Sequence, residues 1–168
     1  MVKSVLFVCT GNTCRSVMAE HLLRHYAAEA GLAIKVASAG LGAFAGSPAA
    51  ANTVAVLEEK GISAKRHKAR AVDAGLLAEF DLILAMTKAQ QDRLRAINPA
   101  VSDKIFLLKE FPERMQGPRE ELTGSNEKDY EVSDPFGQSK EIYRQTRQEI
   151  SRVLKAIINA WRREGEQA

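Results

Sequence analysis

The sequence has few cysteines, no long apolar run and little excess charge, and each shortage argues against a class of protein. Two cysteines in 168 residues are too few for a secreted disulfide scaffold, and they cannot by themselves complete a structural zinc site. No apolar stretch approaches the length of a membrane span, and the run before Cys9 is too short for a secretory signal. We therefore expect a cytoplasmic protein that does not bind a membrane.

The formal net charge is only +3, and the basic residues are spread along the chain. This distribution gives little support for binding of nucleic acid, whereas a mildly basic surface suits an anionic substrate. The length of the chain predicts a single domain over residues 1–168, large enough to bury a core, in which residues 164–168 form a frayed tail.

Short apolar runs alternate along the chain with segments of helical periodicity. Strands are expected at 3–8, 33–39, 81–86 and 104–108, and helices at 16–30, 50–60, 88–97 and 138–163. The polar stretch 112–133 is expected to be a loop. Apolar strands that alternate with amphipathic helices predict βαβ units. The expected fold is therefore α/β, with a four-stranded parallel sheet covered by helices on both faces.

The segment from Cys9 to Arg15 joins the first expected strand to the first helix. Ligands of open α/β sheets bind at the carboxyl ends of the strands, where Cys9 is expected. Backbone N–H groups of such a loop bind anions, and an arginine adds a planar set of donors for phosphate oxygens. The positive electrostatic potential of these N–H groups and of the arginine also favours the thiolate, which is the nucleophilic form of cysteine. The spacing thus predicts phosphoryl transfer to sulfur, with no metal or other cofactor.

Two other interpretations of this segment explain less. A buried structural cysteine and a solvated arginine would not account for the coincidence of Cys9, a six-residue loop, Arg15 and a helix start. A Walker A phosphate loop needs a lysine, which this loop lacks.

The stretch also resembles the signature of the low-molecular-weight protein tyrosine phosphatase family: Cys9-Thr10-Gly11-Asn12-Thr13-Cys14-Arg15-Ser16. Further motifs of the family are matched by Ser38-Ala39-Gly40, His67-Lys68-Ala69-Arg70 and Asp134-Pro135-Phe136, so that the resemblance covers about residues 3–162. It implies a flavodoxin-like fold and a protein phosphatase that works through a phosphocysteine intermediate. One departure is Val17, where the family usually has proline; the helix start should be slightly looser as a result.

The resemblance implies a role for each motif. Cys9 would be the nucleophile, and the phosphate would be bound by Thr10, Gly11, Asn12, Thr13, Cys14, Arg15 and Ser16. Asp134 would protonate the leaving group in the first step and act as the base for water in the second. The loop would be held in shape by Asn12, Ser16, Ser38 and His67. Cys14 would form a protective disulfide with Cys9 or, as an equal alternative, would be a packing residue.

Two features bear on the substrate. Family members with the residues from Gly11 to Ser16 resemble bacterial protein arginine phosphatases, whereas tyrosine-specific members usually have a larger aliphatic residue at the position of Thr13. The Asp-Pro-Phe-Gly sequence that starts at Asp134 is also similar to the arginine phosphatase group. Phe136 occupies a position where tyrosine-specific members often have a tyrosine that lines the entrance of the cleft, and Phe44 is expected to form the other wall. A flat guanidinium can stack on such an aromatic face. We predict hydrolysis of phosphoarginine in proteins, with phosphotyrosine as the alternative.

Other functions fit the residues less well. Arsenate reduction on this fold needs additional cysteines to relay a disulfide, and the chain has only two. A catalytically silent phosphate-binding module would not need Cys9, Arg15 and Asp134 together. His21 and His25 have a spacing that can bind a metal, but no third ligand is evident.

The expected partners are phosphorylated proteins and not nucleic acids, and the expected assembly is a monomer or a weak dimer.

Overall fold

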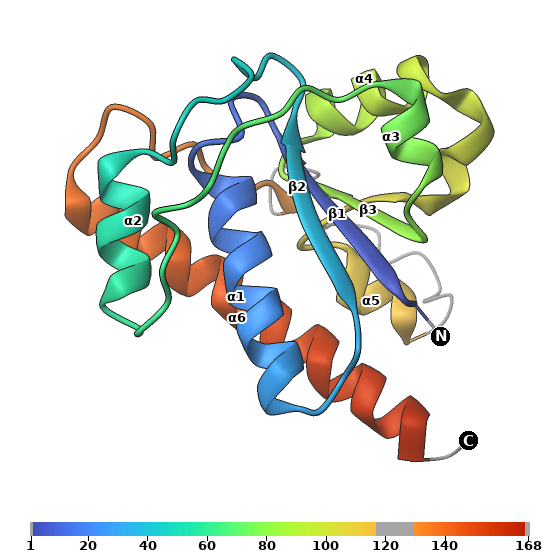
Figure 1. The fold of residues 1–168 in the computed structure, drawn as a ribbon. Coiled ribbons are helices and arrows are strands. Elements are labelled where there is room, and N and C mark those ends of the chain that lie inside the picture. The colour runs from blue at the N-terminus through green and yellow to red at the C-terminus, as the bar shows by residue number, and fades with distance from the viewer. Residues whose placement is uncertain (1, 117–129, 167–168) are drawn as a thin grey trace.

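The computed structural model describes residues 2–116 and 130–166. Four strands form one parallel sheet in the order β2-β1-β3-β4 (Figure 1). Their bounds are Ser4–Cys9 for β1, Lys35–Gly40 for β2, Leu82–Ala85 for β3 and Ile105–Leu107 for β4. β1 lies between β2 and β3, and all six of its residues are buried, as expected for a central strand of a parallel sheet.

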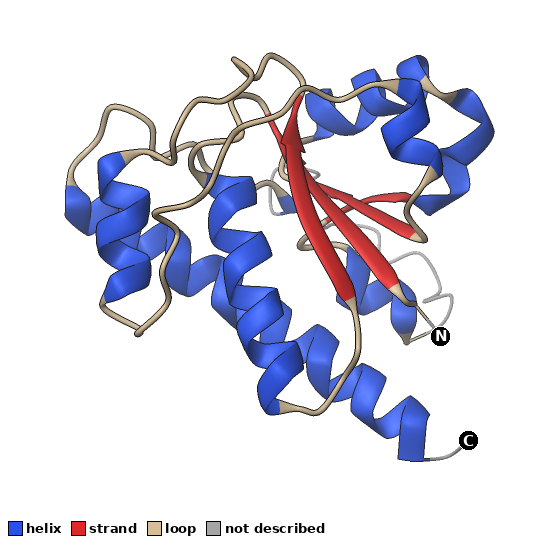
Figure 2. Ribbon diagram, viewed as in Figure 1, coloured by secondary structure: helices blue, strands red, loops and turns tan. Residues whose placement is uncertain are grey.

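Helices cover both faces of the sheet (Figures 1 and 2). On one face lie α1 (Arg15–Glu29), α2 (Ala51–Glu58), α5 (Phe111–Met115) and α6 (Lys140–Glu166). On the other lie α3 (Ala74–Ala78), α4 (Lys88–Ile97) and the 3-10 helix Pro99–Lys104. The predicted α/β fold, with a four-stranded parallel sheet and helices on both faces, is confirmed.

Alternate residues of β1 divide between two hydrophobic cores. Val5 and Phe7 belong to the core under α1 and α6, whereas Leu6 and Val8 belong to the core under α3 and α4. All four side chains are fully buried. Each such burial contributes about 1.5–3 kcal/mol, so the strand that ends at Cys9 is firmly anchored.

Several boundaries and short elements differ from the sequence-based expectation. The helix expected at 88–97 is confirmed, but α3, α5 and the 3-10 helix were not expected, because five or six residues are too few to show a helical period. Residues 112–115 belong to α5 and not to a loop, while residues 117–129 of that expected loop lie outside the described residues. α6 continues to Glu166, three residues beyond the expected end of the last helix, and the frayed tail stays a prediction.

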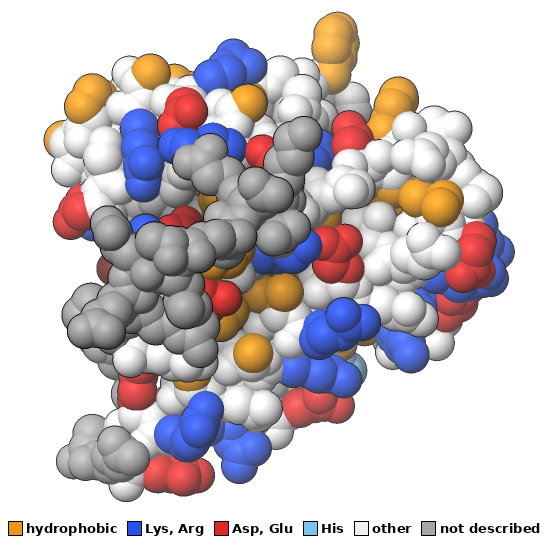
Figure 3. All heavy atoms as spheres, turned by 180° about the vertical axis from the view of Figure 1, so that it is seen from behind, with side chains coloured by type: hydrophobic (Ala, Val, Ile, Leu, Met, Phe, Trp, Pro, Cys, Tyr) orange, Lys and Arg blue, Asp and Glu red, His pale blue; other side chains and the backbone are white. Residues whose placement is uncertain are grey.

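The surface carries mixed charges. On the face seen in Figure 3, lysine and arginine side chains are interspersed with aspartate and glutamate, in keeping with the small net charge. Within the part of the chain that the structure describes, no helix is long and apolar enough to cross a membrane.

Candidate active site

The connection from β1 to α1 lies at the carboxyl end of the central strand. β1 ends at Cys9 and α1 begins at Arg15, and these two residues are 3% and 4% exposed. We call residues 9–15 the phosphate loop. Asn12 has a φ of +55°, in the left-handed region that asparagine adopts more readily than most residues. A helix begins at Arg15 although Val17 stands where the family usually has proline.

The phosphate loop passes directly over Gly40, the last residue of β2. Gly40 pairs with Cys9 in the sheet, and a Cβ atom there would lie 2.6 Å from the Thr10 carbonyl oxygen and 2.9 Å from the Asn12 nitrogen. Both neighbours are backbone atoms, so a side chain could fit only if the loop moved. The backbone of the phosphate loop thus packs against a position that only glycine fits, and the sequence analysis had assigned Gly40 no role beyond its place in a motif.

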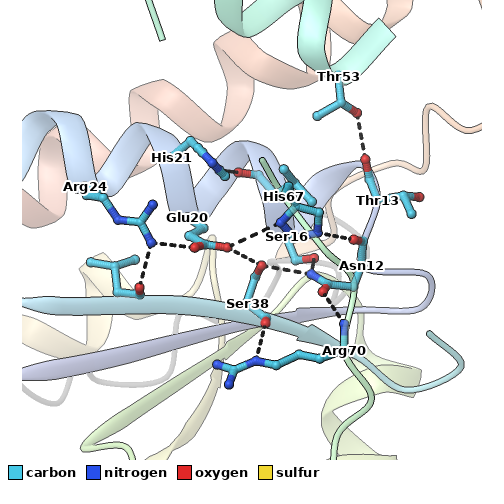
Figure 4. A network of polar contacts seen from close by, with 12 residues as sticks. Asn12, Thr13, Ser16, Glu20, His21, Arg24, Ser38, Thr53, His67 and Arg70 are labelled. Atoms are coloured by element: carbon cyan, nitrogen blue, oxygen red, sulfur yellow. Dashed lines mark hydrogen bonds and ion pairs between the residues drawn. The ribbon is translucent and has the colours of Figure 1, made fainter. Parts of the chain in front are cut away.

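Asn12 is the centre of a buried polar network (Figure 4). Its side-chain nitrogen donates to the hydroxyl oxygens of Ser16 and Ser38, at 2.9 Å each. Its side-chain oxygen accepts the backbone N–H of Arg70 at 3.1 Å, and its carbonyl oxygen accepts from Nε2 of His67 at 2.8 Å. The structure thus brings Asn12, Ser16, Ser38 and His67 together, and these contacts hold the left-handed turn.

Glu20 extends this network and was missed by the sequence analysis. Its carboxylate accepts from the Ser38 hydroxyl and from Arg24 at 2.5 Å, and it lies 4.0 Å from Nδ1 of His67. The same side chain is only 12% exposed. Its position one helical turn after Ser16 was the available signal, because residues four apart share a face of a helix.

Among the described residues, the one close polar partner of the Cys9 sulfur is the Ser16 hydroxyl, at 2.9 Å. Because the Ser16 oxygen accepts from Asn12, its own proton is available to the sulfur. A hydroxyl polarised in this way stabilises a thiolate and the sulfur that leaves when a phosphocysteine is hydrolysed.

Arg15 connects the phosphate loop to the segment before α6. One terminal nitrogen donates to the Val132 carbonyl at 2.9 Å, and the other lies 3.5 Å from the Asp134 carboxylate. Nε of Arg15 is buried and has no hydrogen-bond partner among the described residues. A buried guanidinium N–H without an acceptor is unfavourable unless a ligand binds it. Phosphate oxygens match the geometry of guanidinium donors.

These residues enclose a cavity of about 220 Å³. It is lined by Cys9, Thr10, Gly11, Thr13, Cys14, Arg15, Asp134 and Phe136. The Asp134 side chain is 53% exposed, and its Oδ1 accepts the Phe136 N–H at 3.1 Å. Phe44, which was expected to form a wall, is 84% exposed and is not among the lining residues.

Thr13 and Cys14 form a further part of the cavity lining. The Thr13 carbonyl accepts from the Thr53 hydroxyl at 2.9 Å, which fixes the backbone of the phosphate loop at this point. The Cys14 sulfur lies 3.3 Å from the Tyr143 hydroxyl, and both cysteines are free thiols. Burial, followed by the contact with Cys14, raises the pKa of Tyr143. The disulfide between Cys9 and Cys14 stays a prediction.

The two histidines of α1 have separate contacts. Nδ1 of His21 donates to the Val17 carbonyl at 3.0 Å, and burial lowers the pKa of this imidazole. His25 lies 3.4 Å from Glu29. Within residues 2–116 and 130–166 there is no group of three or more side chains that could hold a metal ion.

Comparison with known proteins agrees with this geometry. Residues 4–167 match the family described as low molecular weight phosphotyrosine protein phosphatase. A protein-arginine-phosphatase of Bacillus subtilis (strain 168) is 39% identical, over 91% of this chain and 93% of its own. The low molecular weight protein-tyrosine-phosphatase Wzb of Escherichia coli (strain K12) is 34% identical, over 85% of this chain and 84% of its own.

A solved structure of the YwlE arginine phosphatase, a cysteine-to-serine mutant with a phosphorylated active-site serine, is 35% identical with a TM-score of 0.80. It is matched over 93% of both chains. The chain described here therefore belongs to the low-molecular-weight phosphotyrosine protein phosphatase family and is a cysteine phosphatase that acts on phosphoarginine or phosphotyrosine.

Proposed function

We propose that the chain hydrolyses phosphoarginine in proteins through a phosphocysteine intermediate at Cys9. The observation that carries this choice of substrate is Thr13, whose short side chain lines the same cavity as Cys9 and Asp134. Its hydroxyl can accept a hydrogen bond from the guanidinium group that carries the phosphoryl group. A larger aliphatic side chain at this position would fill that space.

Phe136 gives a second reason for a guanidinium. It lines the cavity and is 71% exposed, so a face of its ring is available to a flat cationic group. The B. subtilis relative, which is 39% identical, bears the name protein-arginine-phosphatase and supports the same substrate. Wzb, at 34% identity, is a tyrosine phosphatase, which makes phosphotyrosine the alternative to be tested.

In the first step the Cys9 thiolate attacks phosphorus, an S–P bond forms and the P–N bond of phosphoarginine breaks. The electron pair of that bond goes to the guanidinium nitrogen, which takes a proton from the carboxylic acid form of Asp134. Backbone N–H groups of the phosphate loop and the unpartnered Nε of Arg15 stabilise the phosphoryl oxygens during transfer.

In the second step a water molecule attacks phosphorus, and the S–P bond breaks. The Asp134 carboxylate takes a proton from the water, inorganic phosphate leaves and the Cys9 thiolate is restored. The Ser16 hydroxyl, 2.9 Å from the sulfur, stabilises this leaving thiolate. The phosphorylated active-site serine of the YwlE mutant supports transfer of the phosphoryl group to the side chain at this position.

The test compares kcat/KM for two peptides of one sequence, one with phosphoarginine and the other with phosphotyrosine, at neutral pH in a reducing buffer. We expect a preference for phosphoarginine, and Thr13→Ile should move the ratio toward phosphotyrosine by about tenfold or more. Thr13→Val is the matched control, since it removes the hydroxyl while keeping the size of the side chain. A wild-type preference for phosphotyrosine would overturn the proposed substrate and leave the chemistry at Cys9 standing.

A further inference from the structure

A second cavity, of about 470 Å³, opens beside the catalytic one. It shares Thr10, Arg15 and Asp134 with that cavity, so the two lie side by side. It runs between the start of α4 and residues 131–134, and we call it the side groove. Its other lining residues are Leu41, Thr87, Ala89, Gln90, Arg93, Glu131, Val132 and Ser133.

The α4 wall of the side groove is tied to the phosphate loop through Gln90. This side chain is 5% exposed, and its amide nitrogen donates to the Thr10 hydroxyl at 3.2 Å. Its oxygen accepts the backbone N–H groups of Met86 and Thr87 at 3.0 and 3.1 Å. The wall is therefore held at a fixed position relative to the phosphate loop, as a site for substrate requires.

Four charged side chains line the side groove, and three of them have partners. Arg15 and Asp134 lie 3.5 Å apart, and Glu131 accepts the backbone N–H of Lys88 at 2.9 Å. Arg93 is exposed on α4, and within residues 2–116 and 130–166 no side chain forms an ion pair or hydrogen bond with it. A guanidinium without a partner, on the rim of a groove that lies beside the cavity of Cys9, suits a carboxylate.

We propose that the side groove binds the residues next to the phosphorylated one and that Arg93 pairs with an acidic side chain there. This inference rests on the proposed function only in requiring a phosphorylated protein as substrate. An extended chain advances by about 3.3 Å per residue, and a cavity of this volume is roughly 8 Å across, so the side groove holds about two residues. The chain thus selects phosphoproteins with an acidic residue within two positions of the phosphoryl group.

The experiment uses phosphopeptides that differ only in carrying glutamate or lysine at one of these neighbouring positions. The readout is the ratio of kcat/KM for the acidic peptide to that for the basic peptide, measured separately in a phosphoarginine series and in a phosphotyrosine series. We expect a wild-type ratio of about threefold or more at one position, the size typical of a partly exposed ion pair. The ratio should fall as salt is added.

Arg93→Glu should invert this ratio, because the acidic peptide would then meet a like charge. Arg66→Glu is the matched control: Arg66 is an exposed arginine that lines a separate cavity beside Glu20 and His67, and the same change of charge there should keep the ratio. A wild-type ratio near one at every position, or a ratio that survives Arg93→Glu, would overturn the proposal. Failure of the phosphoarginine assignment would appear differently, as faster turnover of the whole phosphotyrosine series.

Discussion

The two walls of the catalytic cavity are built in opposite ways. On the side of Cys9, the proposed nucleophile, Asn12 and Ser16 have no exposed surface, and Cys9 and Arg15 are 3% and 4% exposed. On the side of the proposed acid, the Asp134 side chain is 53% exposed, and it accepts a hydrogen bond from the backbone of Phe136, which is 71% exposed. The first wall is part of the core, whereas the second stands in solvent.

This difference fits the chemistry that we propose for each wall. Every substrate presents the same phosphoryl group, so donors fixed in advance by a buried network stabilise its transition state without later rearrangement. Leaving groups and their protein context vary, and an open wall can receive them. We therefore expect changes in the buried wall to abolish the chemistry, and changes in the open wall to alter its dependence on the substrate.

The largest effect is expected from Cys9→Ser. A serine hydroxyl is not ionised at neutral pH, and the phosphoserine that forms is hydrolysed far more slowly than a phosphocysteine, so kcat/KM should fall at least about a thousandfold. The measurement is turnover of an aryl phosphate. As a control, inorganic phosphate should raise the melting temperature of the variant, which would show that its phosphate loop is intact. Turnover that survives this change would exclude Cys9 as the nucleophile.

Gly40→Ala tests the buried wall without touching a reacting group. The added Cβ would lie 2.6 Å from the Thr10 carbonyl oxygen, so the phosphate loop must shift. We expect a loss of about a hundredfold in kcat/KM and a fall of about 1–3 kcal/mol in the free energy of unfolding. Gly42→Ala is the control, since its Cβ would meet nothing nearer than 3.9 Å. Equal kcat/KM and equal stability of the two variants would contradict the close packing at Gly40.

Asp134→Asn tests the open wall. Loss of a general acid costs about a hundredfold in rate with a poor leaving group, and less with a phenol that leaves readily as its anion. Kinetics with a series of aryl phosphates of increasing leaving-group pKa measures this dependence. The melting temperature should change little, since the carboxylate is half exposed. A loss of rate that is the same for every leaving group would assign the proton transfer to another residue.

His21→Gln is expected to have the smallest effect, and only on stability. Burial lowers the pKa of His21 below its usual 6.5, so the unfolded chain binds this proton more readily than the folded one. The stability of the wild type should therefore fall as the pH drops through 6.5, and the variant should show less of this fall. Urea unfolding at pH 7.5 and at pH 5.5 measures the change in the free energy of unfolding, with His25→Gln as the control. If wild type and variant lost stability equally between these pH values, His21 would not be the cause of the pH dependence.

Elements and contacts close in sequence could be predicted, and those that depend on folding could not. The four strands and the helix 88–97 follow from runs of apolar residues and from periodicity. Asp134 is distant in sequence from Cys9 and Arg15, and only the family resemblance predicted that it would share their cavity. The contact of Cys14 with Tyr143, 129 positions away, has no signal in the spacing of residues. Phe44 was expected to form a wall of the cleft, but it belongs to a variable loop whose path the sequence does not determine, and its side chain is exposed and does not line the cavity.

The most direct test of the account is rapid quenching of the wild-type chain during turnover of a phosphoarginine peptide, followed by mass spectrometry of the fragment that carries Cys9. We predict a transient phosphoryl group on the Cys9 sulfur, which forms and decays at rates that account for turnover. A chain that turns over the peptide while Cys9 stays unmodified at every time would contradict the account.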